Sequence, residues 1–418
     1  MKHSAIALAA IAVIMTAVSC NKSAKTISVS VKVDETKLTE AGVPSPESYS
    51  VTLSNFSTGA SVEAATENGV ASAAGLVPGV YSITVSGAST KDGFSYTIAG
   101  SSSNVDLLND GEEVSVSVDA VKEAALVFKE IYYTGCKFTS TDETSGTETT
   151  TNYFRDQFYE IYNNSDQTVY ADGLCISTTI YANYDYSIIY EWPIDNADQY
   201  VFCDTVWQIP GDGTQYPIQP GESFIIAQWG TNHKAESLTN GASPVDLSGA
   251  EFEAVEKEST TWNGITLTDN AAVNMAQVID ADGYQTPQWL TSVSGARYVL
   301  FKPVTPLKNS DFITATNNDW AGVGREIPVS EVIDAVQSVA SEDNMAYLGL
   351  PTVLDAGGIY CSGIYTTESI ARKVKETRAD GTVVYQDTNN TTNDFEVKSD
   401  PTVRRNGAKV PAWNTWIK

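Results

Sequence analysis

The chain has 418 residues, of which 42% are apolar, and its 52 acidic and 25 basic side chains give a formal net charge of −27 at pH 7. This acidic excess argues against a nucleic-acid partner and against broad docking on anionic lipid, because both carry negative charge. The histidines are His3 and His233, too few for most zinc centres and for multi-histidine iron or copper centres. His233 stands in the polar stretch 230–234, which predicts a solvated loop side chain.

The first 19 residues combine a basic start with an apolar run too short to span a bilayer, which is typical of an export signal. Cys20 follows the small residues Ala17 and Ser19 and precedes a polar stretch. This arrangement resembles a bacterial lipoprotein signal, which implies removal of residues 1–19 and anchoring to a membrane through acylated Cys20. Ordinary secretory cleavage near Ser19 is the alternative. Residues 20–26 then form a tether.

Residues 27–121 contain short stretches in which apolar and polar side chains alternate, separated by turn signals. This pattern predicts half-buried strands and a small β-sandwich. Residues 75–81, Gly-Leu-Val-Pro-Gly-Val-Tyr, resemble a strand entry of transthyretin-like and collagen-adhesin B-type sandwiches. That resemblance implies a spacer or presentation module and no binding site.

Residues 122–418 continue with strand-like segments, and the polar stretch 139–151 is predicted to be an exposed hairpin connection. Several motifs occur in the order found in the lamin-tail immunoglobulin-like domain: Glu130-Ile131, Phe158-Tyr-Glu-Ile-Tyr-Asn, Val169-Tyr-Ala-Asp-Gly, Ile218-Gln-Pro-Gly and Asp387-Thr-Asn-Asn. The resemblance implies a larger, decorated immunoglobulin-like β-sandwich with a long insertion at about 229–360. Residues 328–339 fit either a helix or a strand running into a turn. The fold class expected for the whole chain is all-β.

The complete layout resembles a family of Bacteroidota lipoproteins, domain of unknown function 4876, a resemblance that implies no activity. Surface-exported lipoproteins of this group usually carry acidic residues directly after the cysteine. Residues 21–25 contain none, which favours the periplasmic face of the outer membrane over the cell surface.

Two constellations invite a chemical interpretation. Cys175 and Cys203 stand in neighbouring β-rich segments of an exported chain, so we predict a disulfide between them, with buried free thiols as the alternative. Residues 280–283, Asp-Ala-Asp-Gly, resemble the start of a calcium loop, but they lack its remaining ligands and equally fit a turn. The sequence predicts no metal site and no cofactor, with Ca²⁺ as the open alternative.

Aromatic side chains are the best candidates for ligand binding. Tyr184, Tyr186, Tyr190 and Trp192 are crowded into one segment. Flat aromatic faces with polar tips suit sugar rings and protein surfaces, although packing inside the sandwich would produce the same pattern.

These observations predict a non-enzymatic binding or accessory lipoprotein of the outer membrane, which partners an uptake channel or recognises a glycan. The first alternative is a glycan hydrolase that uses Glu130 and Glu160 as paired carboxylates. The second is a structural or adhesive stalk. In the lamin-tail resemblance the two glutamates have a structural role and bond to loop backbone.

Overall fold

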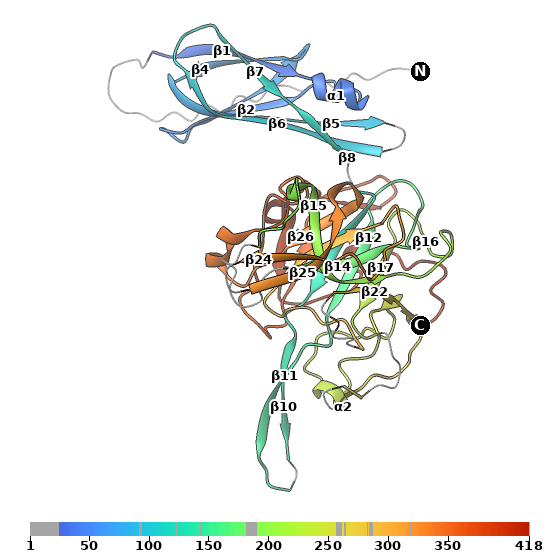
Figure 1. The fold of residues 1–418 in the computed structure, drawn as a ribbon. Helices are drawn as coiled ribbons and strands as arrows, with labels where there is room; N and C mark the ends of the chain where they lie inside the picture. Colours follow the sequence, from blue (N-terminus) through green and yellow to red (C-terminus); the bar gives the residue numbers. More distant parts are fainter. Residues whose placement is uncertain are drawn as a thin grey trace. The chain divides into compact units, whose positions relative to one another are not determined.

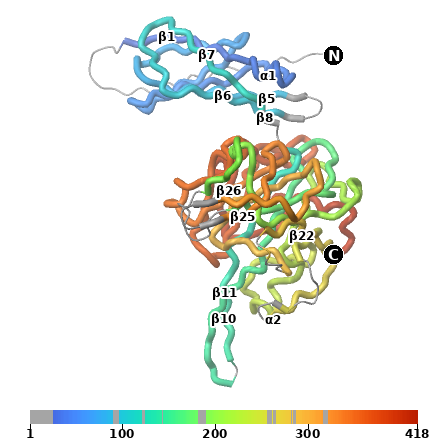
Figure 2. Tube along the Cα trace, viewed as in Figure 1, coloured from blue at the N-terminus to red at the C-terminus, as the bar shows by residue number. Residues whose placement is uncertain are grey.

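The structure is a computed structural model that describes residues 25–91, 94–122, 124–142, 144–180, 190–255, 261–262, 265–281, 283, 287–317 and 320–417. The chain divides into two compact units, and it passes from the first to the second between Lys122 and Glu123 (Figures 1 and 2). Strands make up most of the regular secondary structure in both units, which confirms the all-β fold class. No helix among the described residues is long and apolar enough to cross a membrane.

The first unit is an eight-stranded sheet folded over a core of its own. The strands follow the order β7 (Glu112–Ser117), β1 (Ile27–Asp34), β4 (Val70–Leu76), β3 (Ser61–Glu67), β2 (Ser50–Asn55), β5 (Gly79–Lys91), β6 (Phe94–Leu107) and β8 (Asp119–Lys122). One short helix, α1 (Thr36–Ala41), follows β1. Alternation explains the core: Val29, Val31 and Val33 of β1 are buried while the residues between them are not. Strands from both ends of the sheet share one apolar cluster.

The second unit is a sandwich of two seven-stranded sheets. Its first sheet has the order β21 (Val273–Asn274), β18 (Phe252–Glu253), β17 (Ser223–Ala227), β12 (Phe158–Asn163), β9 (Leu126–Tyr132), β27 (Ser369–Arg372) and β30 (Phe395–Lys398). Its second sheet has the order β24 (Ile313–Asn317), β25 (Trp320–Pro328), β15 (Tyr200–Gln208), β14 (Cys175–Thr179), β23 (Arg297–Phe301) and β26 (Val332–Gln337), with β22 (Ala276–Asp280) also on β15.

The segment 229–360, expected to be an insertion, therefore supplies most strands of the second sheet rather than a separate decoration. Within it, residues 328–339 form a 3₁₀ turn, Val329–Glu331, followed by strand β26. The apolar spacing that also fits a helix instead belongs to a strand, because β26 pairs with β23 and directs Val336 into the core.

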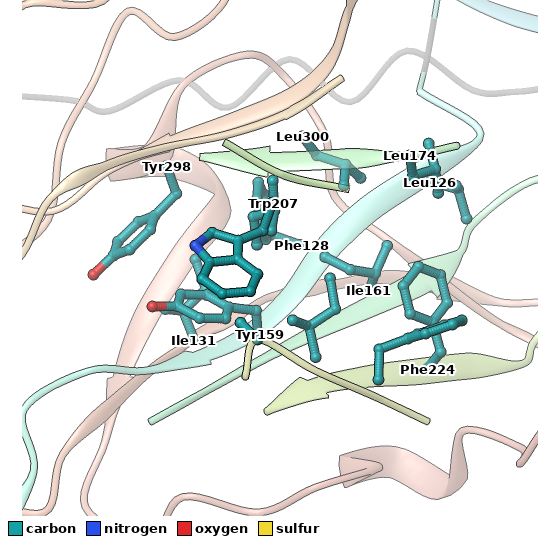
Figure 3. Close-up of a cluster of buried hydrophobic side chains, with 14 of the residues drawn as sticks. Leu126, Phe128, Ile131, Tyr159, Ile161, Leu174, Trp207, Phe224, Tyr298 and Leu300 are labelled. Carbon is teal, nitrogen blue, oxygen red and sulfur yellow. The ribbon is translucent and has the colours of Figure 1, made fainter. Parts of the chain in front are cut away.

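Large aromatic side chains fill the space between the two sheets (Figure 3). Tyr159 from the first sheet contacts Tyr298 from the second, with ring centroids 5.5 Å apart. Trp207 is fully buried among them. The burial of aromatic residues in such numbers favours a rigid sandwich, because each removes a large apolar area from water.

A two-stranded hairpin extends from this sandwich (Figure 1). Its strands are β10 (Cys136–Thr141) and β11 (Glu148–Tyr153), paired in continuous antiparallel register. The connection predicted over 139–151 is thus mostly strand, and only the residues between β10 and β11 turn. Threonine-rich sequence is compatible with this because β-branched side chains favour strands.

The remaining elements are short: β13 (Val169–Tyr170) with β16 (Pro217–Ile218), β19 (Thr261–Trp262) with β20 (Ile265–Thr266), β28 (Val374–Thr377) with β29 (Val383–Tyr385), α2 (Glu236–Thr239), α3 (Thr391–Asp394), and 3₁₀ turns at Ala197–Gln199, Glu342–Tyr347 and Arg405–Gly407.

Candidate functional site

Glu130 and Glu160, the carboxylates proposed for catalysis, lie directly opposite each other on β9 and β12. Both side chains are fully buried. A β-bulge beside this pair shifts the register of the two strands. Lys129 is the extra residue on β9 at this bulge, between Phe128 and Glu130. Its Nζ lies 2.8 Å from Oε2 of Glu160. Burial lowers the pKa of Lys129, against the raising effect of Glu160.

Backbone and side-chain donors from the C-terminal segment bond the same carboxylates. The amide N–H of Thr402 donates to Glu130 and that of Arg404 donates to Glu160, each at 2.9 Å. Arg405 forms an ion pair with Glu130 at 2.9 Å. These glutamates therefore fasten residues 402–405 to the sheet by hydrogen bonds, and both carboxylates are closed off from solvent.

The basic C-terminal segment is used inside its own unit. Arg404 pairs with the buried Glu251 at 2.5 Å. The Trp413 ring packs against Tyr216, with centroids 5.0 Å apart, and Trp416 donates its indole N–H to the carbonyl of Ala250. Trp413 packs against the main apolar core of the unit, and Trp416 lies on the loop that contains Ala250.

His233 is fully buried rather than solvated, so the sequence-based prediction for it is wrong. Its two ring nitrogens lie 2.8 Å from the Tyr153 hydroxyl and 2.9 Å from the Trp229 carbonyl. Polar neighbours in the sequence gave no sign of this, because the hairpin base folds over the loop. Burial lowers the pKa of His233 to about 4, so the ring is neutral at pH 7.

The predicted disulfide between Cys175 and Cys203 is also wrong, because both are free and buried. They lie on adjacent strands, but Cys203 is opposite Thr179 and not Cys175. Four residues along β14 separate the two positions by about 13 Å, well beyond the roughly 7 Å limit between the Cα atoms of a disulfide. Burial raises the pKa of each thiol to about 12, which keeps it unreactive.

The candidate calcium loop lies only partly within the described residues. Asp280 ends strand β22, and its backbone N–H donates to Asn309. Asp282 lies outside the described residues. Across the part of the chain that the structure describes, no three acidic, histidine or cysteine side chains gather in a way that could hold a metal ion.

The aromatic candidates give the strongest site. Tyr184 and Tyr186 lie outside the described residues, but Tyr190 and Trp192 line a pocket of about 380 Å³ at one end of the second sheet. Strand register explains this location. Thr179 pairs with Cys203, and Thr178 pairs with Tyr298, so the end of β14 lies beside the starts of β15 and β23.

Stacking holds the aromatic wall of the pocket in place. The rings of Trp192 and Phe202 are nearly parallel, with centroids 3.8 Å apart. Tyr190 lies against β25, where a Cβ at Gly322 would come within 3.2 Å of its ring. Both candidates are only half-buried, so each retains an exposed surface for a ligand.

Polar groups that the sequence analysis missed also line the pocket. Arg297, at the start of β23, donates from Nη2 to the Tyr347 carbonyl at 2.9 Å. Its guanidinium lies so close to the backbone of Gly349 that a Cβ there would be 2.5 Å from Cζ. Asp198 lines the pocket from the 3₁₀ turn before β15. Nothing in the sequence links Arg297 to Trp192, because they are more than a hundred residues apart.

A pocket of this size, with aromatic faces, one guanidinium and one carboxylate, can bind a small polar molecule that also has flat apolar surfaces. Arg and Asp fix the orientation of hydroxyl groups, and the rings cover C–H faces.

The family model described as "Protein of unknown function (DUF4876)" matches residues 219–402. The crystal structure of a DUF4876 family protein from Bacteroides thetaiotaomicron is 34% identical, covers 93% of this chain and 99% of that chain, and superposes with a TM-score of 0.61. A candidate adhesin from Bacteroides ovatus matches at 9% identity and a TM-score of 0.22 over 76% of this chain and 89% of that chain. No curated protein matches.

Proposed function

The chain belongs to the DUF4876 family, and we propose that it is a non-enzymatic binding protein of the cell envelope that captures a carbohydrate in the pocket around Trp192. The proposal is carried by a single observation. One cavity is lined by two aromatic and two charged side chains, namely Tyr190, Trp192, Arg297 and Asp198. Sugar rings offer C–H faces to aromatic rings and hydroxyl groups to charged side chains.

The location in the envelope is a separate part of the proposal. The N-terminal signal supports removal of residues 1–19 and acylation of Cys20, which lies outside the described residues. Two or more acyl chains on Cys20 would attach the protein stably to the membrane, since a single chain binds only reversibly. The proposed place is the outer membrane, on its periplasmic face, beside an uptake channel.

The family resemblances support a different role for each of the two units. The first unit serves as a spacer of the transthyretin-like type. The second serves as the binding module, with the lamin-tail immunoglobulin-like sandwich as its scaffold. Glycan hydrolysis by Glu130 and Glu160 has little support, because each carboxylate is buried and bonded to its own chain.

The test is isothermal titration of the whole mature chain against a panel of oligosaccharides, followed by variants. For a sugar that binds, Trp192→Ala should raise Kd about tenfold, because an aromatic face contributes roughly 1.5 kcal/mol. Tyr170→Ala is the matched control, since Tyr170 is exposed in the same unit and does not line the pocket.

No heat with any sugar would contradict the carbohydrate proposal. An equal loss of affinity in both variants would place binding elsewhere. Retained affinity in Trp192→Ala, with an unchanged circular dichroism spectrum, would contradict the assignment of the pocket.

A further inference from the structure

Three exposed apolar side chains belong to neighbouring loops of the first unit. They are Phe56, Val77 and Leu108, with 60%, 41% and 56% of their surfaces exposed. Each follows directly on a strand end: Phe56 follows β2, Val77 follows β4 and Leu108 follows β6. We refer to these three residues as the apolar tip.

Strand pairing brings the three loops to one end of the unit. The amide N–H of Phe56 donates to the carbonyl of Val80. Gly79, two residues after Val77, pairs with Leu107, which directly precedes Leu108. The apolar tip is thus a single feature built from the loops that follow β2, β4 and β6.

A buried asparagine holds two of these loops rigidly. Asn55 accepts hydrogen bonds from the backbone N–H groups of Ser57 and Thr58, and its Nδ2 donates to the carbonyl of Val77. The hydroxyl of Tyr81 donates to the same carbonyl at 2.7 Å. Phe56 and Val77 are therefore presented on a backbone held by hydrogen bonds, so ordering these two loops on a partner surface costs little entropy.

The chain enters this unit at the same end. Ile27, the first residue of β1, pairs with Leu76, the neighbour of Val77. Cys20 lies seven positions before Ile27, so the chain between them spans at most roughly 25 Å. The exit lies at the other end, because β8 pairs with β6 at Tyr96–Ala99, about 26 Å along the strand from Leu107.

We propose that the apolar tip docks on the bilayer to which Cys20 is attached, inserting Phe56, Val77 and Leu108 among the lipid headgroups. This rests on the proposed lipid anchor and adds a second, protein-based contact to it. Phe is typical of side chains that lie at the boundary between headgroups and acyl chains. Two carboxylates nearby, Asp110 and Glu112, accept from the backbone N–H groups of Ser28 and Leu108, and their charge favours neutral over anionic headgroups.

The experiment uses the acylated full chain in phosphatidylcholine vesicles, with and without bromine on the lipid chains. All eight tryptophans lie in residues 123–418, so Phe56→Trp adds a reporter to a unit that has none. The emission of the added tryptophan is obtained by subtracting the spectrum of the unsubstituted protein from that of the variant. Glu40→Trp is the matched control, because Glu40 is exposed on α1, which follows the opposite end of β1.

The expected result is a blue-shifted emission of Phe56→Trp that brominated lipid quenches strongly, with no quenching of Glu40→Trp. Adding Val77→Asp and Leu108→Asp should abolish most of that quenching. Equal quenching at both positions, or none at either while the protein floats with the vesicles, would overturn the docking and leave the anchor intact. Failure of the protein to float would overturn both. A protein occupant of the tip would also leave Phe56→Trp unquenched.

Discussion

Glu160 illustrates how the tertiary environment of one residue decides its role. Its two carboxylate oxygens accept from Lys129, from the hydroxyl of Ser223 and from the amide of Arg404. Three donors therefore occupy most of the roughly four lone-pair sites of this buried carboxylate, which is the environment of a structural hydrogen-bond acceptor. The energetic consequence is that its removal leaves Lys129 buried without its ion-pair partner.

Glu160→Gln should accordingly lower the free energy of unfolding by about 3–5 kcal/mol, which is the usual cost of removing one charged partner from a buried ion pair. Urea denaturation followed by tryptophan fluorescence measures this in the second unit, which contains every tryptophan. Glu148→Gln on the exposed hairpin is the control and should change little. A catalytic role would instead predict full stability with lost turnover.

His233 predicts a pH effect with a definite sign. The unfolded ring has a pKa near 6.5, and burial lowers the folded pKa to about 4. The unfolded state therefore takes up a proton first as pH falls, and the native state loses about 3 kcal/mol between pH 6.5 and 4.

His233→Gln should remove this loss. Compared with the parent, the variant should become relatively more stable as pH falls through that window. Asp156 acts in the opposite direction, since burial raises its pKa to about 6, and its contribution cancels when the two proteins are compared at each pH. A difference in unfolding free energy that does not vary with pH would contradict the assignment.

At the scale of elements, an ion cluster clamps the two sheets of the second unit together. Arg372 on β27 pairs with Asp334 on β26 at 2.6 Å and donates from Nε to the carbonyl of Phe128 on β9. Asp334 also accepts from the Phe128 amide. Burial raises the pKa of Asp334 against the lowering effect of Arg372.

Arg372→Lys should weaken this clamp because an ammonium cannot make the planar, forked contacts of a guanidinium. We expect a loss of about 3 kcal/mol or more in the free energy of unfolding, measured by urea denaturation. Hydrogen exchange should increase first in β26 and β27. Arg325→Lys, at a half-exposed ion pair, is the matched control and should cost less than about 1 kcal/mol. Equal effects in both would argue against a clamp.

For the whole molecule, the proposed location gives a direct prediction. Protease added to intact cells should leave the protein uncut, as it leaves a periplasmic control, because the polar stretch after Cys20 has no acidic residue. Immunoblotting measures the surviving band, and permeabilised cells serve as the positive control for cleavage. Loss of the band from intact cells would move the protein to the cell surface.

The sequence by itself determined what depends on local pattern. Alternation of apolar and polar residues at 27–33 is read from neighbours two residues apart, so it predicts strand β1 and, repeated along the chain, an all-β protein. The tertiary structure alone decided what depends on strand register. Register separates Cys175 from Cys203, places Glu130 opposite Glu160, buries His233, and brings Arg297 to Trp192. These are contacts between distant segments, and no local period in the sequence encodes them.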